Sequence, residues 1–178
     1  MKTISKMFAL AVFCVSAAAF AADVKINDTA FPAQDNSFTK TWAFSTKEKA
    51  PEELKLNKAA FYVHHKYKYI CGYRNDLVVK VTAPAAIKSF KVNAHYINYA
   101  DGRKRDYAAE YSVDNKTWTE IQKVNAGGGN AFIKCDNVVP VANDGTVYIR
   151  IRKVLAPKDS NGAVGAVVLK TAGITVNF

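Results

Sequence analysis

The stretch Glu110-Tyr111-Ser112-Val113-Asp114-Asn115-Lys116-Thr117-Trp118-Thr119-Glu120-Ile121 decides the fold, because it contains two strands and the turn that joins them. Apolar and polar side chains alternate up to Val113, as they do in a half-buried strand. Asp114 and Asn115 supply turn chemistry, and the apolar pattern resumes at Trp118 and Ile121. The stretch therefore predicts a β-hairpin.

The same alternation recurs along most of the chain. Strand patterns occur in Val24–Ile26, Phe38–Phe44, Phe61–Cys71, Leu77–Thr82, Ile87–Tyr99, Tyr107–Val113, Val147–Ile151 and Ile174–Phe178, and a short apolar run, Val164–Leu169, fits a strand beside either of its neighbours. Lys47–Lys58 has no clear period and predicts a loop or at most one helical turn. Each strand offers one apolar face, and two such faces are buried only against each other. The chain therefore predicts an all-β protein, an antiparallel two-sheet β-sandwich of the jelly-roll type.

The N-terminus predicts export. Lys2 and Lys6 precede an apolar stretch from Met7 to Phe20, and Ala19-Phe20-Ala21 has the form of a cleavage site. We interpret residues 1–21 as a secretory signal peptide and residues 22–178 as a single β-sandwich domain, secreted or periplasmic. The apolar stretch is shorter than the about 20 residues of a membrane-spanning helix, and no other segment approaches that length.

Charge and cysteines narrow the class further. Without Lys2 and Lys6 the chain has 23 basic residues against 15 acidic ones, a formal net charge of +8, which favours acidic glycans, anionic surfaces or released nucleic acid as partners. Cys71 and Cys135 remain after processing, and an even count in an oxidising compartment predicts a disulfide between them. Two buried free thiols are the alternative.

The hairpin resembles the Y-S-x-D-G-x-x-W hairpin of galactose-binding-like (discoidin and carbohydrate-binding-module) jelly-roll proteins, with Asn115 where glycine is commoner. The later patterns Val147-Tyr148-Ile149-Arg150-Ile151-Arg152 and Ile174-Thr175-Val176-Asn177-Phe178 resemble the end of the same fold. The resemblance covers roughly Leu77–Phe178. It implies carbohydrate binding by loops at one end of the sandwich, and some related modules hold a structural calcium ion. Asp35-Asn36 and Asp159-Ser160-Asn161-Gly162 would supply oxygen ligands for such an ion, although neither has the density of a dedicated calcium loop.

Two segments combine aromatic rings with basic side chains. Sugar rings stack on aromatic faces, and acidic sugar groups pair with guanidinium and ammonium groups, so a glycan site needs both. Tyr62–Arg74 and Tyr96–Arg105 provide this mixture, and the second also reads as a charged hairpin tip. The predicted ligand-binding residues are Tyr62, His64, Tyr67, Tyr73, Arg74, Tyr96, Tyr99, Arg103 and Arg105.

Other candidates are weaker. His64 and His65 are adjacent in a strand pattern and point to opposite faces, which disfavours a shared metal ion. Trp42 and Trp118 are expected in the core. Arg150 and Arg152 share a strand face with Tyr148 and indicate either a basic strip or a charged edge strand.

These patterns favour a secreted, non-catalytic carbohydrate-binding protein, with acidic glycans preferred. One alternative is an extracytoplasmic structural or adhesion protein that binds another protein, such as one at the cell surface. The other is a small polysaccharide lyase or glycoside hydrolase, for which the parts are present without a recognisable arrangement. No cofactor and no nucleic-acid partner is expected, since export removes the usual nucleic acids.

Overall fold

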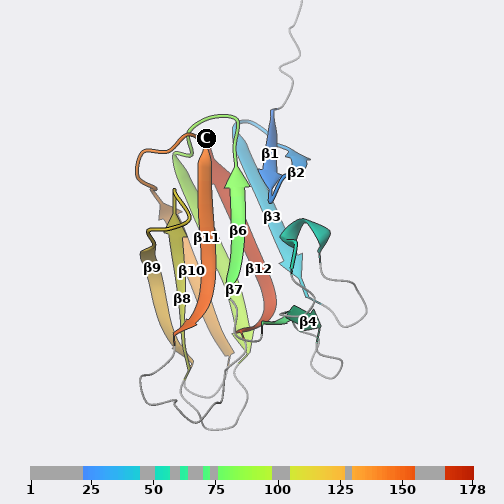
Figure 1. Ribbon diagram of the computed structural model, residues 1–178, viewed down its shortest axis with the longest axis vertical. Helices are drawn as coiled ribbons and strands as arrows, with labels where there is room; N and C mark the ends of the chain where they lie inside the picture. The colour runs from blue at the N-terminus through green and yellow to red at the C-terminus, as the bar shows by residue number, and fades with distance from the viewer. Residues whose placement is uncertain are drawn as a thin grey trace, which may run out of the picture.

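The computed structural model describes residues 22–44, 51–56, 61–63, 70–72, 76–97, 105–126, 130–154 and 167–178, and strands dominate them (Figure 1). The strands are β1 (Asp23–Ile26), β2 (Thr29–Pro32), β3 (Ser37–Ala43), β4 (Phe61–Val63), β5 (Ile70–Gly72), β6 (Leu77–Thr82), β7 (Ser89–Ile97), β8 (Arg105–Ser112), β9 (Thr119–Ala126), β10 (Asn130–Val138), β11 (Thr146–Val154) and β12 (Val167–Asn177). In the described part of the predicted loop lies one 3-10 turn, η1 (Glu52–Leu54).

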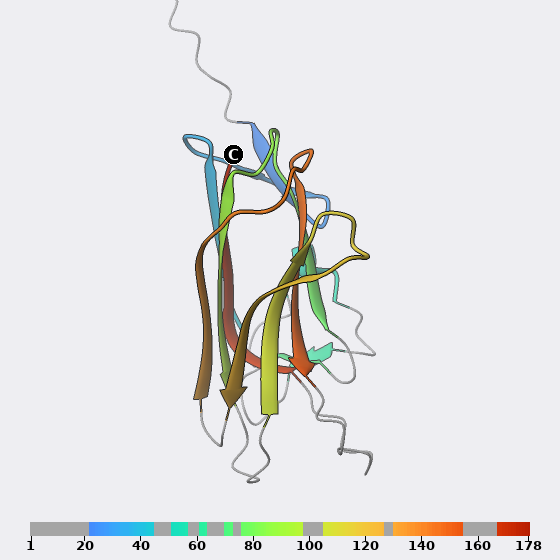
Figure 2. The same ribbon diagram turned by 90° about the vertical axis from the view of Figure 1, so that its left-hand side faces the viewer.

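The strands form two antiparallel sheets that face each other (Figure 2). Sheet A has the order β2-β1-β6-β11-β8-β9, and sheet B has the order β10-β7-β12-β5-β4. β3 also belongs to sheet B, where it pairs with β12 from Ser37 to Ala43 on the side opposite β7. The loop after β10 crosses from sheet B to sheet A and leads into β11 (Figure 2). The predicted all-β, two-sheet sandwich is confirmed.

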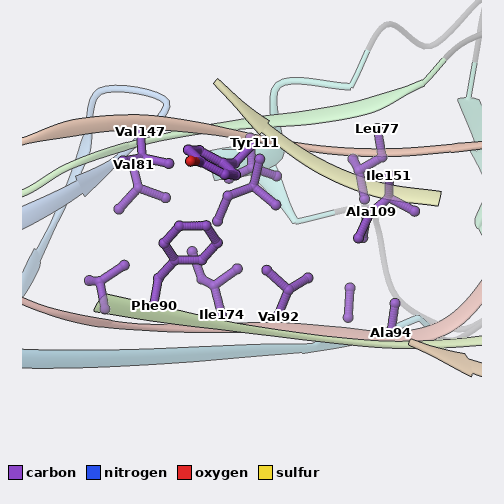
Figure 3. Packing of buried hydrophobic residues seen from close by; sticks show 14 of the residues in the cluster. Leu77, Val81, Phe90, Val92, Ala94, Ala109, Tyr111, Val147, Ile151 and Ile174 are labelled. Carbon is purple, nitrogen blue, oxygen red and sulfur yellow. The ribbon is translucent and has the colours of Figure 1, made fainter. Parts of the chain in front are cut away.

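The core lies between the sheets (Figure 3). Val81, Val147 and Tyr111 from sheet A face Phe90 and Ile174 from sheet B, and all are buried. Phe90 meets Tyr111 edge-on, with ring centroids 5.6 Å apart. Burial of such side chains contributes about 1.5–3 kcal/mol each, so the alternation in the sequence supplies the main force that holds the two layers together.

The predicted hairpin is confirmed, and Asp114 organises its loop. β8 pairs with β9 as far as Tyr111 and Thr119. The Asp114 carboxylate accepts hydrogen bonds from the backbone N–H groups of Lys116 and Thr117, each at 2.8 Å, and from the Ser112 hydroxyl at 2.8 Å. Asn115 has φ 58°, a left-handed conformation that asparagine tolerates better than most residues. Asparagine therefore replaces glycine here without breaking the turn.

Two strand predictions were wrong. The pattern of Phe61–Cys71 suggested one strand, but β4 and β5 pair with each other, with Val63 opposite Ile70, so the chain reverses between them. In the run Val164–Leu169 the described part, Val167–Leu169, is not a strand of its own but begins the long strand β12. Local alternation cannot reveal a reversal inside a run that keeps its period.

The predicted disulfide is also wrong. Cys135 on β10 is a buried free thiol whose Sγ donates to the side-chain oxygen of Gln122 at 3.3 Å. Cys71 lies on β5, and β7 and β12 separate β5 from β10. Three strand spacings amount to about 14 Å, whereas a disulfide requires Cα atoms within about 7 Å. The sheet order therefore keeps the two cysteines apart.

Candidate functional site

Most of the predicted ligand-binding residues lie outside the described residues. These are His64, Tyr67, Tyr73, Arg74, Tyr99 and Arg103. His65, the possible calcium-binding segment Asp159–Gly162 and the predicted signal peptide, residues 1–21, lie outside them as well. Tyr62 and Arg105 are placed by their backbones, in β4 and at the start of β8. Their roles in binding remain predictions.

The strands next to these segments do converge on one end of the sandwich, the lower end in Figure 1. Ile70 of β5 and Tyr96 of β7 both pair with Leu169 of β12, one from each side. Tyr62–Arg74 and Tyr96–Arg105 are far apart in the sequence, yet each includes a residue paired with Leu169. Sheet pairing therefore brings parts of the two predicted segments close together.

Tyr96 was predicted to bind a ligand, but the structure places its side chain in the core. Its side chain is fully buried and stacks on Tyr107, with ring centroids 4.3 Å apart and an interplanar angle of 17°. Burial raises the pKa of Tyr96 well above its ordinary value. Tyr96 shares the inward face of β7 with Phe90 and Val92, so its ring contributes to the core and is closed to an external ligand.

The outer face of sheet A carries an ion-pair cluster around Glu110. Glu110 is only 4% exposed, although its side chain lies on the outer face. Its carboxylate accepts hydrogen bonds from Nε and Nη2 of Arg150 and, at 2.8 Å, from Nε of Arg152. The Arg150 guanidinium lies 4.0 Å from the Trp118 ring centre. Trp118 therefore packs outside the sandwich, contrary to prediction, while Trp42 is in the core as expected.

This cluster leaves little free positive charge. β11 is a central strand of sheet A, so Arg150 and Arg152 do not protect an edge. Both pair with Glu110, and Arg150 Nη1 also lies 3.8 Å from Asp76. Burial raises the pKa of Asp76 against the opposing effect of Arg150. The positive charge of the predicted basic strip is thus largely neutralised. The ion pairs between Glu110 of β8 and the two arginines of β11 join these strands, and we call this cluster the latch between β8 and β11.

The outer face of sheet B has a different character, because small polar side chains cover its middle. The strand registers align outward-facing residues of β3, β12 and β7 in rows across the sheet. The rows are Ser37–Asn177–Ser89, Thr39–Thr175–Lys91, Thr41–Gly173–Asn93 and Ala43–Thr171–His95. β10 extends the last two rows with Lys134 beside Asn93 and Phe132 beside His95.

A hollow of about 170 Å³ lies at the centre of these rows. It is lined by Thr39, Thr41, Asn93, Thr171, Ala172, Gly173, Ile174 and Thr175. Gly173 is placed in the interior of the longest strand, where a glycine often marks a close approach of another group to the backbone. A Cβ atom built there would lie 3.3 Å from Thr41 Oγ1 and 3.4 Å from the Lys40 carbonyl oxygen. Both contacts are tight, so a side chain at this position would require Thr41 to shift by a few tenths of an ångström.

An exposed aromatic ring, that of Phe132 on β10, lies on the same face as the hollow, and we call it the aromatic platform. Phe132 is 61% exposed and stacks on the His95 ring, with centroids 4.3 Å apart and an interplanar angle of 20°. One face of the phenyl ring therefore packs on imidazole, which holds the ring in place. The other face of the ring is open to solvent and can accept the apolar face of a sugar, so Phe132 is a candidate contact for a ligand.

Charge borders the same face. Lys91 and Lys134 both approach Asp136, at 3.7 and 3.8 Å, and Lys134 is the more exposed of the two. The three groups together carry one net positive charge. Distances of this length in exposed positions indicate weak pairing, so the two ammonium groups are free to reorient.

The described residues that line the hollow carry hydroxyl, amide and alkyl groups. Within the described ranges no group of three or more histidine, cysteine, aspartate or glutamate side chains is placed to hold a metal ion. The same part of the chain also contains no helix that is long and apolar enough to cross a membrane.

Sequence reasoning missed this face, although part of the signal was available. Thr39 and Thr41 alternate with Phe38 and Trp42, and alternation alone assigns them to the outer face. It does not show that β3 and β12 are neighbours, which is what brings Thr41 beside Gly173. The partner strand is a long-range choice and has no local signature.

No protein-family model and no curated protein matches this chain. Among solved structures, a family 35 carbohydrate binding module from Clostridium thermocellum is 12% identical over 85% of this chain and 90% of the module, with a TM-score of 0.36. CBM29-2, a family 29 carbohydrate binding module, is 8% identical over 86% of this chain and 92% of its own, with a TM-score of 0.37.

A truncated AlyQ with CBM32 and alginate lyase domains is 12% identical over 63% of this chain, with a TM-score of 0.34, and the match spans only 27% of AlyQ. The matched structures thus include carbohydrate-binding modules, the class of domain that the hairpin resembles. At these TM-scores and identities they identify neither a ligand nor a site in this chain, and the fold assignment rests on the strand pairing itself.

Proposed function

We propose that this protein is a secreted, non-catalytic carbohydrate-binding protein and that the outer face of sheet B is a binding surface. The observation that carries the proposal is the hollow over Gly173, lined by hydroxyl and amide groups, on the same face of sheet B as the exposed Phe132 ring. A sugar presents both hydroxyl groups and apolar C–H faces, and this surface offers a partner for each.

The hydrogen-bonding part of the surface is built from rigid strands. Thr41, Thr171 and Asn93 project from three strands held in register by backbone hydrogen bonds. Threonine hydroxyls donate and accept, and the asparagine amide does both through separate atoms, so the set is compatible with the mixed donors and acceptors of a sugar. Sites on strands hold their geometry better than sites on loops.

The chemistry of the hollow favours binding over catalysis. Glycoside hydrolysis commonly uses two carboxyl groups on either side of the scissile bond, and polysaccharide lyases need a base. Hydroxyl, amide and alkyl groups provide neither near neutral pH. This supports a binding role for the surface of sheet B.

Acidic glycans are the preferred ligand class in this proposal. Without the predicted signal peptide the chain keeps a formal net charge of +8, 23 basic residues against 15 acidic ones, which attracts polyanions over long range. Lys91 and Lys134 lie at the border of the hollow and share one carboxylate, that of Asp136. A uronate or sulfate group held there would gain one or two charge-assisted hydrogen bonds.

A glycan array probed at low and at moderate salt tests the proposal. The wild-type protein is expected to bind uronate or sulfated glycans, more weakly as salt rises because exposed charges are screened. Binding that is insensitive to salt and limited to neutral glycans would contradict the acidic preference. A blank array would contradict carbohydrate binding altogether.

Two variants locate the surface. Gly173→Ala places one methyl group in the hollow, where contacts of 3.3 Å to Thr41 Oγ1 and 3.4 Å to the Lys40 carbonyl oxygen require a small shift of the Thr41 side chain. It is expected to lower glycan binding, and urea unfolding of the same variant shows whether the fold is kept. The matched control is Val139→Ala, which shortens another exposed apolar residue in the loop after β10 and should leave binding unchanged. Equal binding by all three proteins would place the site elsewhere.

A further inference from the structure

The hollow and the aromatic platform are separate on sheet B, and their separation sets the size of the ligand. Gly173 is on β12 and Phe132 is on β10, with β7 between them. In the strand registers, Gly173 is opposite Asn93, whereas Phe132 is opposite His95, two residues further along β7. Two strand spacings and two residues combine to a diagonal of about 12 Å.

Resting on the proposed function, we propose that this surface has two subsites and binds an oligosaccharide chain that crosses the strands from Gly173 to Phe132. One subsite is the hollow, which hydrogen-bonds hydroxyl groups. The other is the Phe132 ring, on which an apolar sugar face stacks. A separation of about 12 Å exceeds what one pyranose ring covers, so a monosaccharide occupies one subsite at a time.

Two outward-facing side chains of β7 lie between the subsites. Asn93 and His95 project outward from β7 along the diagonal, with Asn93 exposed and His95 half-buried. The Asn93 amide is therefore placed to contact a sugar unit midway. Lys134 adjoins Asn93 on β10, at the side of the path, where an acidic substituent on the middle unit would find it.

Linking two weak subsites through one ligand has a measurable consequence. The second contact becomes intramolecular once the first is made, so affinity rises with chain length until both subsites are filled and then levels off. A stacked sugar contributes about as much as an aromatic pair, which corresponds to about tenfold in affinity.

Calorimetric titration with length series of oligogalacturonates and of manno-, xylo- and cello-oligosaccharides, from monosaccharide to hexasaccharide, tests the inference. In the series that binds, the affinity is expected to rise at least about tenfold between the monosaccharide and the tetrasaccharide, with no further gain at greater length. Phe132→Ala is expected to reduce tetrasaccharide affinity about tenfold while leaving monosaccharide affinity in the hollow unchanged.

The outcomes separate this inference from the proposed function. A monosaccharide that binds the wild type as tightly as the tetrasaccharide would overturn the two-subsite model while leaving carbohydrate binding intact. The same holds if Phe132→Ala binds every length like the wild type. If no series binds the wild type and the array is also blank, the proposed function itself fails. Val139→Ala again serves as the control that should follow the wild type at every length.

Discussion

At the scale of single residues, Glu110 shows how position in a sheet changes the meaning of a charge. In the sequence it stands among basic residues and suggests ordinary surface charge. In the structure Glu110 pairs with two guanidinium groups, one of which lies on the Trp118 ring, and it is almost completely buried on an outer face. A buried carboxylate that holds two arginines is a structural element, and its loss leaves two positive charges facing each other.

Glu110→Ala is therefore expected to destabilise the protein by about 3 kcal/mol, the lower end of the usual range because both arginines are partly exposed. Urea unfolding at pH 7 measures the change. Glu120→Ala is the matched control, since Glu120 is exposed on β9 directly opposite Glu110 and its removal should cost less than about 0.5 kcal/mol. Similar losses for the two variants would refute the latch between β8 and β11.

Asp114 predicts a dependence of stability on pH. Hydrogen bonds from the Thr117 and Lys116 backbone N–H groups, then from Ser112, lower the pKa of this carboxyl from 3.8 in the folded state. Its ionised form therefore stabilises the fold fully above that value, and the contribution is lost as pH falls below it towards the folded-state pKa. Asp114→Ala should lower the unfolding midpoint at pH 7, and the gap from the wild type should narrow at pH 2. A gap that stays constant with pH would rule out the charged carboxylate as the cause.

At the scale of elements, different side-chain hydrogen bonds connect the two sheets at the two sides of the sandwich. On the β2 and β3 side, η1 bridges the sheets: the Trp42 indole N–H donates to Glu53 Oε1 at 2.9 Å, and the Asn27 side-chain amide donates to the Glu53 carbonyl at 3.0 Å. On the β9 and β10 side, Gln122 Oε1 accepts from the backbone N–H of Lys134 at 3.0 Å and from the Cys135 thiol. Gln122 thus satisfies a donor on the edge of sheet B from sheet A.

Gln122→Ala is expected to destabilise the protein by about 1 kcal/mol, the usual net value of one hydrogen bond, and to speed hydrogen exchange at the Lys134 amide. Exchange measured residue by residue by NMR checks the second effect. Lys134→Thr is the control, because it changes the side chain but keeps the amide that Gln122 binds. Unchanged protection of that amide in Gln122→Ala would show that the side-chain contact does not hold the edge.

At the scale of the whole molecule, packing of the apolar faces holds the two sheets together, and Cys71 and Cys135 lie on strands of the same sheet that are not neighbours. A disulfide closing a loop of about 65 residues would contribute roughly 4 kcal/mol, and its reduction would be obvious. Burial raises the pKa of the Cys135 thiol to about 11, so this group stays protonated and unreactive near neutral pH.

We expect the urea unfolding midpoint to be the same with and without dithiothreitol. We also expect alkylation of Cys135 by iodoacetamide at pH 8 to be slow in the native protein and fast in denaturant. Mass spectrometry of the alkylated Cys135 peptide follows the reaction. Two results together would support a disulfide after all: a lower urea unfolding midpoint with dithiothreitol, and no alkylation of Cys135 in the denatured chain without it.

The fold class, the hairpin and the inward or outward position of most strand residues follow from the sequence by itself. Alternation is a local property with a period of two, and each strand carries it independently of its neighbours. This is why the core positions of β6, β8 and β11 are predictable. By the same alternation, the sequence places Tyr96 on the same strand face as Phe90 and Val92.

Only the tertiary structure decided which strands lie side by side, and with them the candidate site. Thr41 and Gly173 belong to opposite ends of the chain, and the separation of Cys71 from Cys135 is set by the two strands between β5 and β10. Such pairings depend on the best burial of all apolar faces together, which no short stretch encodes. The hollow over Gly173 exists because β3 and β7 pair with opposite sides of β12 and enclose one residue that has no side chain.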